Sequence, residues 1–592
     1  MADFVFIARQ IDGVIMIKIL KYFKWYYWLI ALAIVGVVVG QVQLDLLLPE
    51  LMADIVAAAT TPGSTVDAIW DAGLKMLACS LGSVLCTILA SFLASRLAAG
   101  FSQILRGKIF EKVESFSMAE MNSFSTASLI TRCTNDVQQI QMLITFGLRL
   151  MVTAPVMAVG ALVKMIDKSA QLTLLTACGI VVIVLFVIVM YFTVVPRFKT
   201  IQKFVDRLNG VTRENLTGLR VVRAYNAEDY QEEKFEEVNK PLTKTYLFVN
   251  RIMALMHPVM QVVMNGMSLG IVWLGAFLIS DNLLDLPTMS SFNMYSMQVI
   301  MSFVMLTMVF IFLPRASVSA KRINEVLETE NLVKDPLLPE KVCGKKGEIE
   351  FKNVSFKYPD GDDYVLKNIS FKAEKGMTVA IIGSTGSGKS TLLNLIPRFY
   401  DATEGEVLVD GVNVKNLAQH DLREKLGYVP QKSVLFSGTI QSNLCFGAPD
   451  AERAELEKAV AVAQAQNIVQ SKGFSGNIAQ GGQNMSGGQK QRISIARAIV
   501  KNPEIYLFDD SFSALDYKTD KLLRQALKKE VEGSTNIIVA QRIGTIKNAD
   551  LILVLEDGKI VGQGTHEQLI KNCGVYREIA SSQLSKEELE NV

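Results

Sequence analysis

The sequence is poor in the residues that hold metal ions or form disulfide frameworks. Its 592 residues include only three histidines and seven cysteines. No two cysteines form a CxxC pair, so the sequence indicates neither a zinc site nor a set of disulfides. Lysine and arginine number 60 and aspartate and glutamate 58, which leaves a formal net charge of +2. A chain so close to neutral gives no reason to expect a nucleic-acid partner.

Charge is also scarce in the first half of the chain, where five stretches of 20 to 29 residues carry none. About twenty apolar residues cross the hydrocarbon core of a bilayer, so each stretch predicts a transmembrane helix. A sixth pass, near residues 140–163, carries Arg149, which we expect to lie within protein or beyond the bilayer. The uncharged stretches are residues 25–44, 76–95, 170–196, 252–280 and 286–314.

The charges between these stretches predict an orientation in the membrane. Residues 96–136 hold five lysines and arginines and residues 197–251 hold eleven, whereas residues 45–71 hold none. Positively charged loops stay on the cytoplasmic side. The short loop 164–168 argues the other way and is outweighed. We therefore predict a multi-pass protein of the cytoplasmic membrane, with both termini in the cytoplasm.

The composition changes along the chain and predicts three parts. A membrane domain (1–320) is followed by a charged linker (321–346) and a second domain (347–592). In the second domain short β-branched runs alternate with helical segments, which is typical of an α/β nucleotide-binding fold. The predicted fold class is thus an all-α six-helix membrane domain followed by an α/β P-loop domain. The membrane helices are expected at about 23–45, 69–98, 138–163, 169–196, 246–280 and 286–314.

A phosphate-binding loop follows the run TVAIIG, which begins at Thr378. The next residues complete the pattern GxxxxGK[ST], and a helical pattern comes after them. Backbone N–H groups of such a loop and the N-terminus of its helix attract phosphate oxygens. Lys389 is expected to contact the β- and γ-phosphates, and Ser390 to bind Mg²⁺. The predicted ATP-binding loop consists of Gly383, Ser384, Thr385, Gly386, Ser387, Gly388, Lys389, Ser390 and Thr391.

Two weaker motifs follow in the same domain. The apolar run IYLF ends at Asp509, as expected of a buried strand that brings a carboxylate to Mg²⁺. A Gly-Gly pair opens a helical pattern near residue 487, which suits a second anion-binding helix start. By themselves the strand is most often ordinary core and the helix start an ordinary cap. This second motif consists of Ser486, Gly487, Gly488 and Gln489.

The order of these motifs resembles that of an ATP-binding-cassette (ABC) domain. Six membrane passes ahead of it resemble the half-transporter arrangement of ABC exporters, and residues 214–225 resemble part of that family's membrane domain. The resemblance covers nearly the whole chain. It extends to Gln431 and to the motif called the D-loop, made of Ser513, Ala514, Leu515 and Asp516.

The resemblance implies a geometry and a set of roles. In that family two cassettes meet head to tail, so that ATP lies between one chain's phosphate loop and the other chain's signature motif, here residues 486–489. Tyr358 matches the aromatic residue that stacks on adenine. Gln431 matches the glutamine that, with Ser390 and Asp509, serves Mg²⁺ and links it to the membrane domain. Cytoplasmic turns near 118–125 and 222–228 match the coupling helices.

Two positions depart from the family pattern. The family places a glutamate directly after the metal-binding aspartate, where it polarises the attacking water, and this chain has Asp510. The shorter side chain withdraws the carboxylate by about 1 Å, and such a displacement costs on the order of a hundredfold in rate. The family also has a histidine where this chain has Gln541. An amide forms hydrogen bonds but cannot carry a proton as imidazole does.

Because both hydrolytic positions are altered and the binding positions are kept, we predict a degenerate site that binds Mg-ATP but hydrolyses it slowly. The hypothesis is an ATP-driven exporter of small amphipathic molecules (of the drug, lipid or peptide class), formed with a second half-transporter that has an intact site. One alternative is an active homodimer that tolerates both substitutions. The other is an ATP-gated regulator without net pumping. Arg149 and His257 are weak candidates for the substrate path.

Overall fold

The computed structural model describes residues 18–62, 64–340 and 347–584. Its contacts divide the chain into two compact units, which we describe separately. The membrane unit contains described residues of Met1–Lys112 and Ala127–Glu328, and the cassette unit contains those of Val113–Thr126 and Thr329–Val592. A helical unit followed by an α/β unit confirms the predicted fold class.

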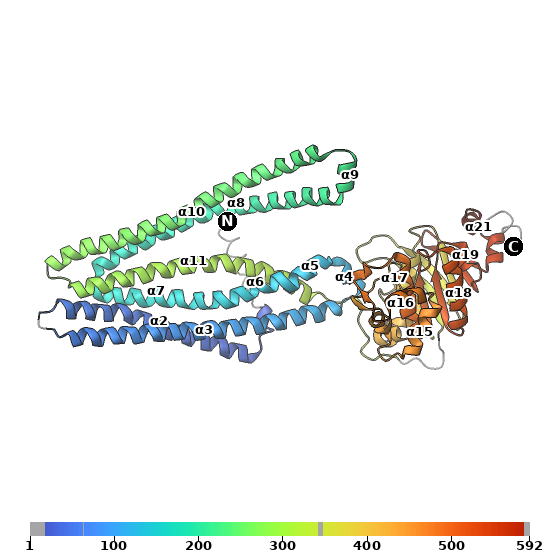
Figure 1. The fold of residues 1–592 in the computed structure, drawn as a ribbon, viewed down its shortest axis with the longest axis horizontal. Helices are drawn as coiled ribbons and strands as arrows, with labels where there is room; N and C mark the ends of the chain where they lie inside the picture. The colour runs from blue at the N-terminus through green and yellow to red at the C-terminus, as the bar shows by residue number, and fades with distance from the viewer. Residues whose placement is uncertain (1–17, 63, 341–346, 585–592) are drawn as a thin grey trace. The chain divides into compact units, whose positions relative to one another are not determined.

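The membrane unit is built of long helices (Figure 1). Among the described residues, five continuous helical segments are long and apolar enough to cross a membrane: Trp25–Thr60, Val66–Glu114, Thr126–Lys168, Ala170–Thr217 and Glu228–Ser280. The remaining predicted pass, at residues 286–314, lies within α11. The elements are α2 (Trp25–Thr60), α3 (Val66–Glu114), α5 (Thr126–Thr131), α6 (Val137–Met142), α7 (Leu148–Lys168), α8 (Ala170–Thr217), α9 (Leu219–Ala224), α10 (Glu228–Ser280) and α11 (Leu286–Glu328), with π-helical turns η1 (Arg132–Asp136) and η2 (Leu143–Gly147).

Most of these helices extend well beyond the uncharged stretches that predicted them. In α8 and α10 the extensions are amphipathic, and they bury Ile201, Leu242 and Val249 between them. An apolar run marks only the part of a helix that suits lipid, whereas an amphipathic stripe continues the helix by packing on a neighbour. α8 and α10 therefore lie side by side and are joined by the short helix α9 (Figure 1).

Helix α11 also extends eight residues into the segment that composition predicted as a linker. Ile323 and Val326 are fully buried there, although charged residues surround them in the sequence. Two apolar residues three positions apart lie on the same helix face, so packing continues the helix where average composition indicates a loop. Within the same unit α2, α7 and α11 pack together through Val42, Met165 and Tyr295.

The cassette unit contains two main sheets. In the six-stranded sheet, five parallel strands are ordered β11-β3-β10-β9-β6, and β12 pairs antiparallel with β11 at one edge. The four-stranded antiparallel sheet has the order β2-β1-β4-β5, and β7 pairs with β8. The strands are β1 (Ile349–Phe356), β2 (Leu366–Ala373), β3 (Thr378–Gly383), β4 (Glu404–Val409), β5 (Val412–Asn413), β6 (Leu426–Val429), β7 (Gly438–Thr439), β8 (Asn477–Ile478), β9 (Ile505–Asp509), β10 (Thr535–Val539), β11 (Leu551–Glu556) and β12 (Lys559–Gly564).

Apolar side chains cover both faces of the parallel sheet. On β9, Leu507 faces the cluster shared with the antiparallel sheet, and Tyr506 and Phe508 face the cluster shared with the helices. A strand buried on both faces is continuously apolar, and its carboxyl end is the first place where polar groups are tolerated. The helices are α4 (Met118–Ser123), α12 (Lys389–Leu395), α13 (Gln419–Glu424), α14 (Ile440–Leu444), α15 (Arg453–Val462), α16 (Gln466–Lys472), α17 (Gly487–Val500), α18 (Tyr517–Glu530), α19 (Ile543–Ile546), α20 (His566–Asn572) and α21 (Gly574–Ser581), with 3₁₀ turns η3 (Val414–Asn416), η4 (Cys445–Gly447) and η5 (Gln480–Gly482).

Candidate nucleotide-binding site

The carboxyl ends of three neighbouring strands meet at one edge of the parallel sheet. Val539 of β10 is in register with Asp509 of β9 and with Ile381 of β3. Parallel strands of an open α/β sheet place ligands outside their carboxyl ends. The phosphate loop after β3, the aspartates after β9 and Gln541 after β10 are therefore gathered at one place, as the motif order predicted.

The phosphate loop is closed by a left-handed glycine. Gly388 has φ +95° and precedes the first turn of α12. A Cβ atom at this position would lie 2.8 Å from Leu366 Cδ2 and 3.2 Å from the Val365 carbonyl oxygen, so the loop requires glycine for both conformation and space. The amides at the start of α12 are consequently available to an anion.

Lys389 lies across the loop. Its Nζ donates hydrogen bonds to the carbonyl oxygens of Gly383 at 2.9 Å and Ser384 at 2.6 Å. Burial lowers the pKa of the Lys389 ammonium, and the carboxylates of Asp510 and Asp509 oppose that shift. Neutral carbonyls thus hold the ammonium beside the loop, and it can exchange these hydrogen bonds for contacts with phosphate oxygens.

The residues predicted to hold Mg²⁺ lie together. Ser390 Oγ donates a hydrogen bond of 2.8 Å to Asp509 Oδ1. Burial raises the pKa of Asp509, and the hydrogen bond from Ser390 opposes this increase. A hydroxyl and a carboxylate side by side next to a phosphate loop fit a hard divalent cation such as Mg²⁺. Gln431, two residues beyond β6, is exposed and interacts with Asp510.

Asp510 and Gln541, the two positions that depart from the family pattern, form a hydrogen-bonded pair. Gln541 Nε2 donates to Asp510 Oδ2 at 2.9 Å. Asp510 is 6% exposed, and its backbone is left-handed, with φ +45°. Burial raises its pKa, while hydrogen bonds from Gln431 and Ser513 act in the opposite direction. One oxygen of the carboxylate is therefore engaged by an amide.

Tyr358 lies beside the phosphate loop, as predicted. Its hydroxyl is 2.9 Å from Thr391 Oγ1, and its ring makes T-shaped contacts with Phe356 and Tyr400 at centroid distances of 5.0 and 5.2 Å. The Tyr358 and Tyr400 rings also line a cavity of about 260 Å³ with Ala119 of α4 and Val333, and no residue of the phosphate loop lines it. The contact with Thr391 alone therefore places the Tyr358 ring, which could stack on a planar base, beside the loop.

The signature residues form the start of α17. Ser486 Oγ accepts a hydrogen bond from the Gln489 amide at 3.4 Å, and Gln489 Oε1 accepts one from the Ser486 amide at 3.0 Å. This capping box leaves the amides at residues 487 and 488 free for an anion. A Cβ atom at Gly488 would lie 3.1 Å from the Ala514 carbonyl oxygen, so the D-loop (residues 513–516) packs closely on the helix start.

Several contacts that support the site have no signal in the sequence. Gln491 Oε1 accepts a hydrogen bond from the Ala514 amide at 3.3 Å and joins α17 to the D-loop. Asn122 of α4 donates to the Tyr400 hydroxyl at 2.9 Å. A glutamine in a helical run and an asparagine nearly 280 residues from its partner carry no local signal.

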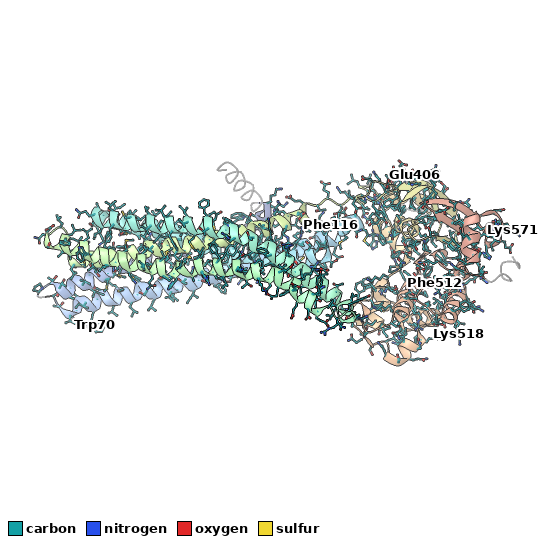
Figure 2. The ribbon with its side chains drawn as sticks, turned by 90° about the horizontal axis from the view of Figure 1, so that it is seen from above. Trp70, Phe116, Glu406, Phe512, Lys518 and Lys571 are labelled. Carbon is teal, nitrogen blue, oxygen red and sulfur yellow. The ribbon has the colours of Figure 1, made fainter. Side chains whose placement is uncertain are left out.

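Within the cassette itself, Phe512 lies in the interior and Lys518 projects from the surface (Figure 2).

The remaining predicted residues lie in other surroundings. The turn predicted at 118–125 contains α4, and that at 222–228 includes the end of α9. Arg149 Nη1 donates a hydrogen bond of 3.0 Å to Ser91 Oγ on α3. His257 is exposed on α10, next to Pro258. These contacts do not bring Arg149 and His257 together into a common site.

Fold and site together define a P-loop nucleotide-binding cassette joined to a helical membrane domain, and comparison with known proteins identifies the family. Residues 27–303 match the family described as ABC transporter transmembrane region, and residues 366–513 match that described as ABC transporter. An uncharacterized ABC transporter ATP-binding protein of Mycobacterium tuberculosis is 41% identical over 545 residues, which is 91% of this chain and 93% of that protein.

Two further relatives extend the comparison. YfiB of Bacillus subtilis, an uncharacterized ABC transporter ATP-binding protein, is 34% identical over 97% of this chain and 99% of its own. YheI of the same organism, named a probable multidrug resistance ABC transporter ATP-binding/permease protein, is 33% identical over 80% of this chain and 82% of its own. A solved bacterial Atm1-family ABC exporter with ATP bound matches 95% of this chain and all of that chain, with a TM-score of 0.79 and 25% identity.

The chain belongs to the ABC transporter family. It is a half-transporter of the exporter type, in which one chain carries the membrane domain and the cassette. The resemblance stated from the motifs is thereby confirmed at this level. ABC cassettes bind ATP, generally with Mg²⁺, and the residues at the sheet edge fit both.

Proposed function

We propose that this chain is one subunit of a heterodimeric ATP-driven exporter of small amphipathic molecules across the cytoplasmic membrane. Its termini and cassette lie in the cytoplasm. Its own phosphate loop forms a site that binds Mg-ATP and hydrolyses it slowly, and its signature motif completes the competent site on the partner. The name of the relative YheI supports a multidrug-type substrate range.

The observation that carries this proposal is the hydrogen bond from Gln541 to Asp510, at 2.9 Å. A carboxylate polarises an attacking water by accepting its proton, and a general base must lie within hydrogen-bond reach of that water. Asp510 is one methylene shorter than glutamate. One of its oxygens accepts a hydrogen bond from an amide, which neither takes up nor releases a proton near neutral pH. Binding and hydrolysis therefore depend on different residues, and only the hydrolytic ones are altered.

The signature side of the chain supports the same assignment. Ser486 and Gln489 cap α17 in full, and Gly488 keeps the close contact with Ala514. The chain thus keeps an intact anion-binding helix start although its hydrolytic pair is altered, as expected of a chain whose signature motif completes a partner's site. The partner's phosphate loop would provide that nucleotide.

The proposal is tested by measuring ATP turnover of the purified chain alone and with its partner half-transporter. We expect slow turnover alone and fast turnover in the complex. The double substitution D510E/Q541H should raise turnover of this chain's own site by roughly tenfold to a hundredfold, because it restores the reach and the proton carrier. Fast turnover by the chain alone that Asp510→Asn abolishes would instead indicate an active homodimer.

Transport separates the exporter from a gate. In proteoliposomes that contain both subunits, a pump accumulates an amphipathic dye against its concentration gradient when ATP is added on the cassette side. The matched control is the same preparation with Lys389→Met in this chain and the equivalent substitution in the partner's phosphate loop. These substitutions remove ATP binding from both sites. Equilibration of the dye without accumulation would contradict export and support the ATP-gated alternative.

A further inference from the structure

Asp45 is a partly buried carboxylate on α2, within an apolar stretch of the membrane unit, and the described residues include no cationic partner for it. Its Oδ1 accepts a hydrogen bond of 2.6 Å from Ser83 of α3, and Gln41 Nε2 lies 3.5 Å from its Oδ2. Within the described part of the chain no lysine, arginine or histidine forms an ion pair with it; nearby Glu50 is paired with Lys164 at 2.9 Å. An ionisable residue in such a place is a candidate functional site.

A proline places a second group on Asp45. Pro49 lies inside α2 and has no N–H to donate to the carbonyl of residue 45, four positions earlier. Gln298 of α11 replaces that donor: its Nε2 is 2.9 Å from the Asp45 carbonyl oxygen. Next to it, the Tyr295 hydroxyl donates to the Leu46 carbonyl at 2.9 Å. The carbonyl that Pro49 leaves without a donor thereby holds the Gln298 side chain beside Asp45.

Both amides leave a carbonyl oxygen without a hydrogen-bond donor. Gln41 is 7% exposed, and its Oε1 is buried and unpartnered. Gln298 Oε1 is likewise buried and unpartnered. Buried polar atoms are nearly always satisfied. Two unsatisfied acceptors therefore require an explanation, one on a side chain that reaches the Asp45 carboxylate and one on a side chain that reaches the Asp45 backbone carbonyl. The surroundings of Asp45 therefore have an excess of acceptor oxygens over donors.

We propose that Asp45, Gln41 and Gln298 form a binding site for a monovalent cation. Its charge would neutralise the carboxylate, and the two amide oxygens would supply ligands, as carbonyl oxygens do for dehydrated cations. An alkali ion and the ammonium head of an amine share this chemistry, and a primary ammonium has three donors for these three groups. If the ligand is an amine, the proposal rests on the proposed export of amphipathic molecules. If the ligand is an alkali ion, it does not.

The experiment measures cation binding by the nucleotide-free full-length chain in lipid nanodiscs. Radiolabelled sodium and rubidium ions are followed by equilibrium dialysis. n-Octylammonium is followed by calorimetry, with 1-octanol as its neutral match. We expect saturable binding of at least one cation, weakened at least tenfold by Asp45→Asn, which keeps the shape and the hydrogen bond from Ser83. Asp71→Asn is the matched control, because Asp71 is exposed on α3 and paired with Lys75.

The arms of the experiment identify the source. Binding of sodium or rubidium indicates an alkali-ion site, and binding of n-octylammonium but not 1-octanol indicates an amine site. If Asp45→Asn alters folding, Gln41→Met removes one acceptor oxygen at similar volume and should also weaken binding. Equal affinity in wild type and both variants, or no saturable binding to any of the probes, would overturn the proposal. Because nucleotide is absent, the result does not depend on which subunit hydrolyses ATP.

Discussion

At the scale of single residues, the contrast between Asp509 and Asp510 decides how the site works. Both follow the same buried strand, and burial raises the pKa of both. Asp509 accepts its hydrogen bond from Ser390, a residue of the phosphate loop, whereas Asp510 accepts one from Gln541, a residue after the neighbouring strand. Under the proposed function the first pair would hold the metal ion, and the second would stand where water is activated.

Asp510→Asn should stabilise the nucleotide-free chain more at pH 8 than at pH 3, which lies below the ordinary pKa of aspartate, as measured by its melting temperature. Burial raises the pKa of Asp510 in the folded state, so the unfolded chain loses this proton at lower pH. Ionisation of the buried carboxyl then favours unfolding as the pH rises through the folded pKa, and asparagine removes that effect. Below the unfolded pKa both states are protonated, and the difference disappears.

Asp516→Asn is the control with the opposite sign. Asp516 caps α18, and its hydrogen bonds to the Thr519 backbone and side chain lower its pKa. Its contribution to stability is present above the unfolded pKa and is lost as the pH falls through the folded pKa. Asp516→Asn should therefore not stabilise the chain at pH 8. A gain from Asp510→Asn that is equal at pH 3 and pH 8 would contradict the assignment of the shift to burial of the charge.

At the scale of elements, the start of α17 and the D-loop form one packed joint. Gln491 bonds to the Ala514 amide, and the Cα of Gly488 faces the Ala514 carbonyl. Movement of the D-loop therefore shifts the signature helix directly. The two adjacent glycines differ in what surrounds them, because a Cβ atom at Gly487 would meet only the Ala514 Cβ, at 4.0 Å.

Gly488→Ala should lower the melting temperature of the cassette, because the added methyl group forces a carbonyl 3.1 Å away to move. A loss of about 1 kcal/mol corresponds to roughly 2–4 °C in a domain of this size. Gly487→Ala has room for its methyl group and gains helix propensity, so it should leave the melting temperature unchanged or slightly higher. Differential scanning fluorimetry of the full chain distinguishes them, and equal effects of the two substitutions would refute the joint.

At the scale of the whole molecule, the proposed two-chain exporter would place this chain's phosphate loop and its signature motif on different nucleotides. A heterodimer with one degenerate site then responds unequally to lesions in one chain. Lesions in residues 486–489 affect the partner's competent site, and lesions in residues 383–390 affect the slow site. A homodimer has no such asymmetry, because each chain supplies both parts to equivalent sites.

Gly487→Asp in this chain should lower ATP turnover of the two-chain complex at least tenfold, because a carboxylate there repels the phosphates of the partner's nucleotide. Lys389→Met in this chain should lower turnover less than about threefold, because it removes ATP only from the slow site. Steady-state ATPase rates measure both, with Gly487→Ala as the uncharged control. If Lys389→Met is as damaging as Gly487→Asp, the two sites are equivalent and the degenerate-site proposal fails.

The sequence by itself determined the class of the molecule and predicted the residues of its nucleotide site. Uncharged stretches record which helices tolerate lipid, and the phosphate loop, Asp509 and the 486–489 motif are local patterns whose chemistry depends on spacing alone. The helix ends were less readable, since packing and not composition continues α8, α10 and α11.

Only the tertiary structure decided the contacts between distant residues. The pairing of Gln541 with Asp510 needs β9 and β10 side by side and in register, and Asn122 meets Tyr400 only when α4 packs on the cassette. The acceptor-rich surroundings of Asp45 arise because Pro49 frees a carbonyl and α11 supplies Gln298 to it. Such contacts join residues far apart in the chain, so no local pattern encodes them, and they form only when folding brings their elements together.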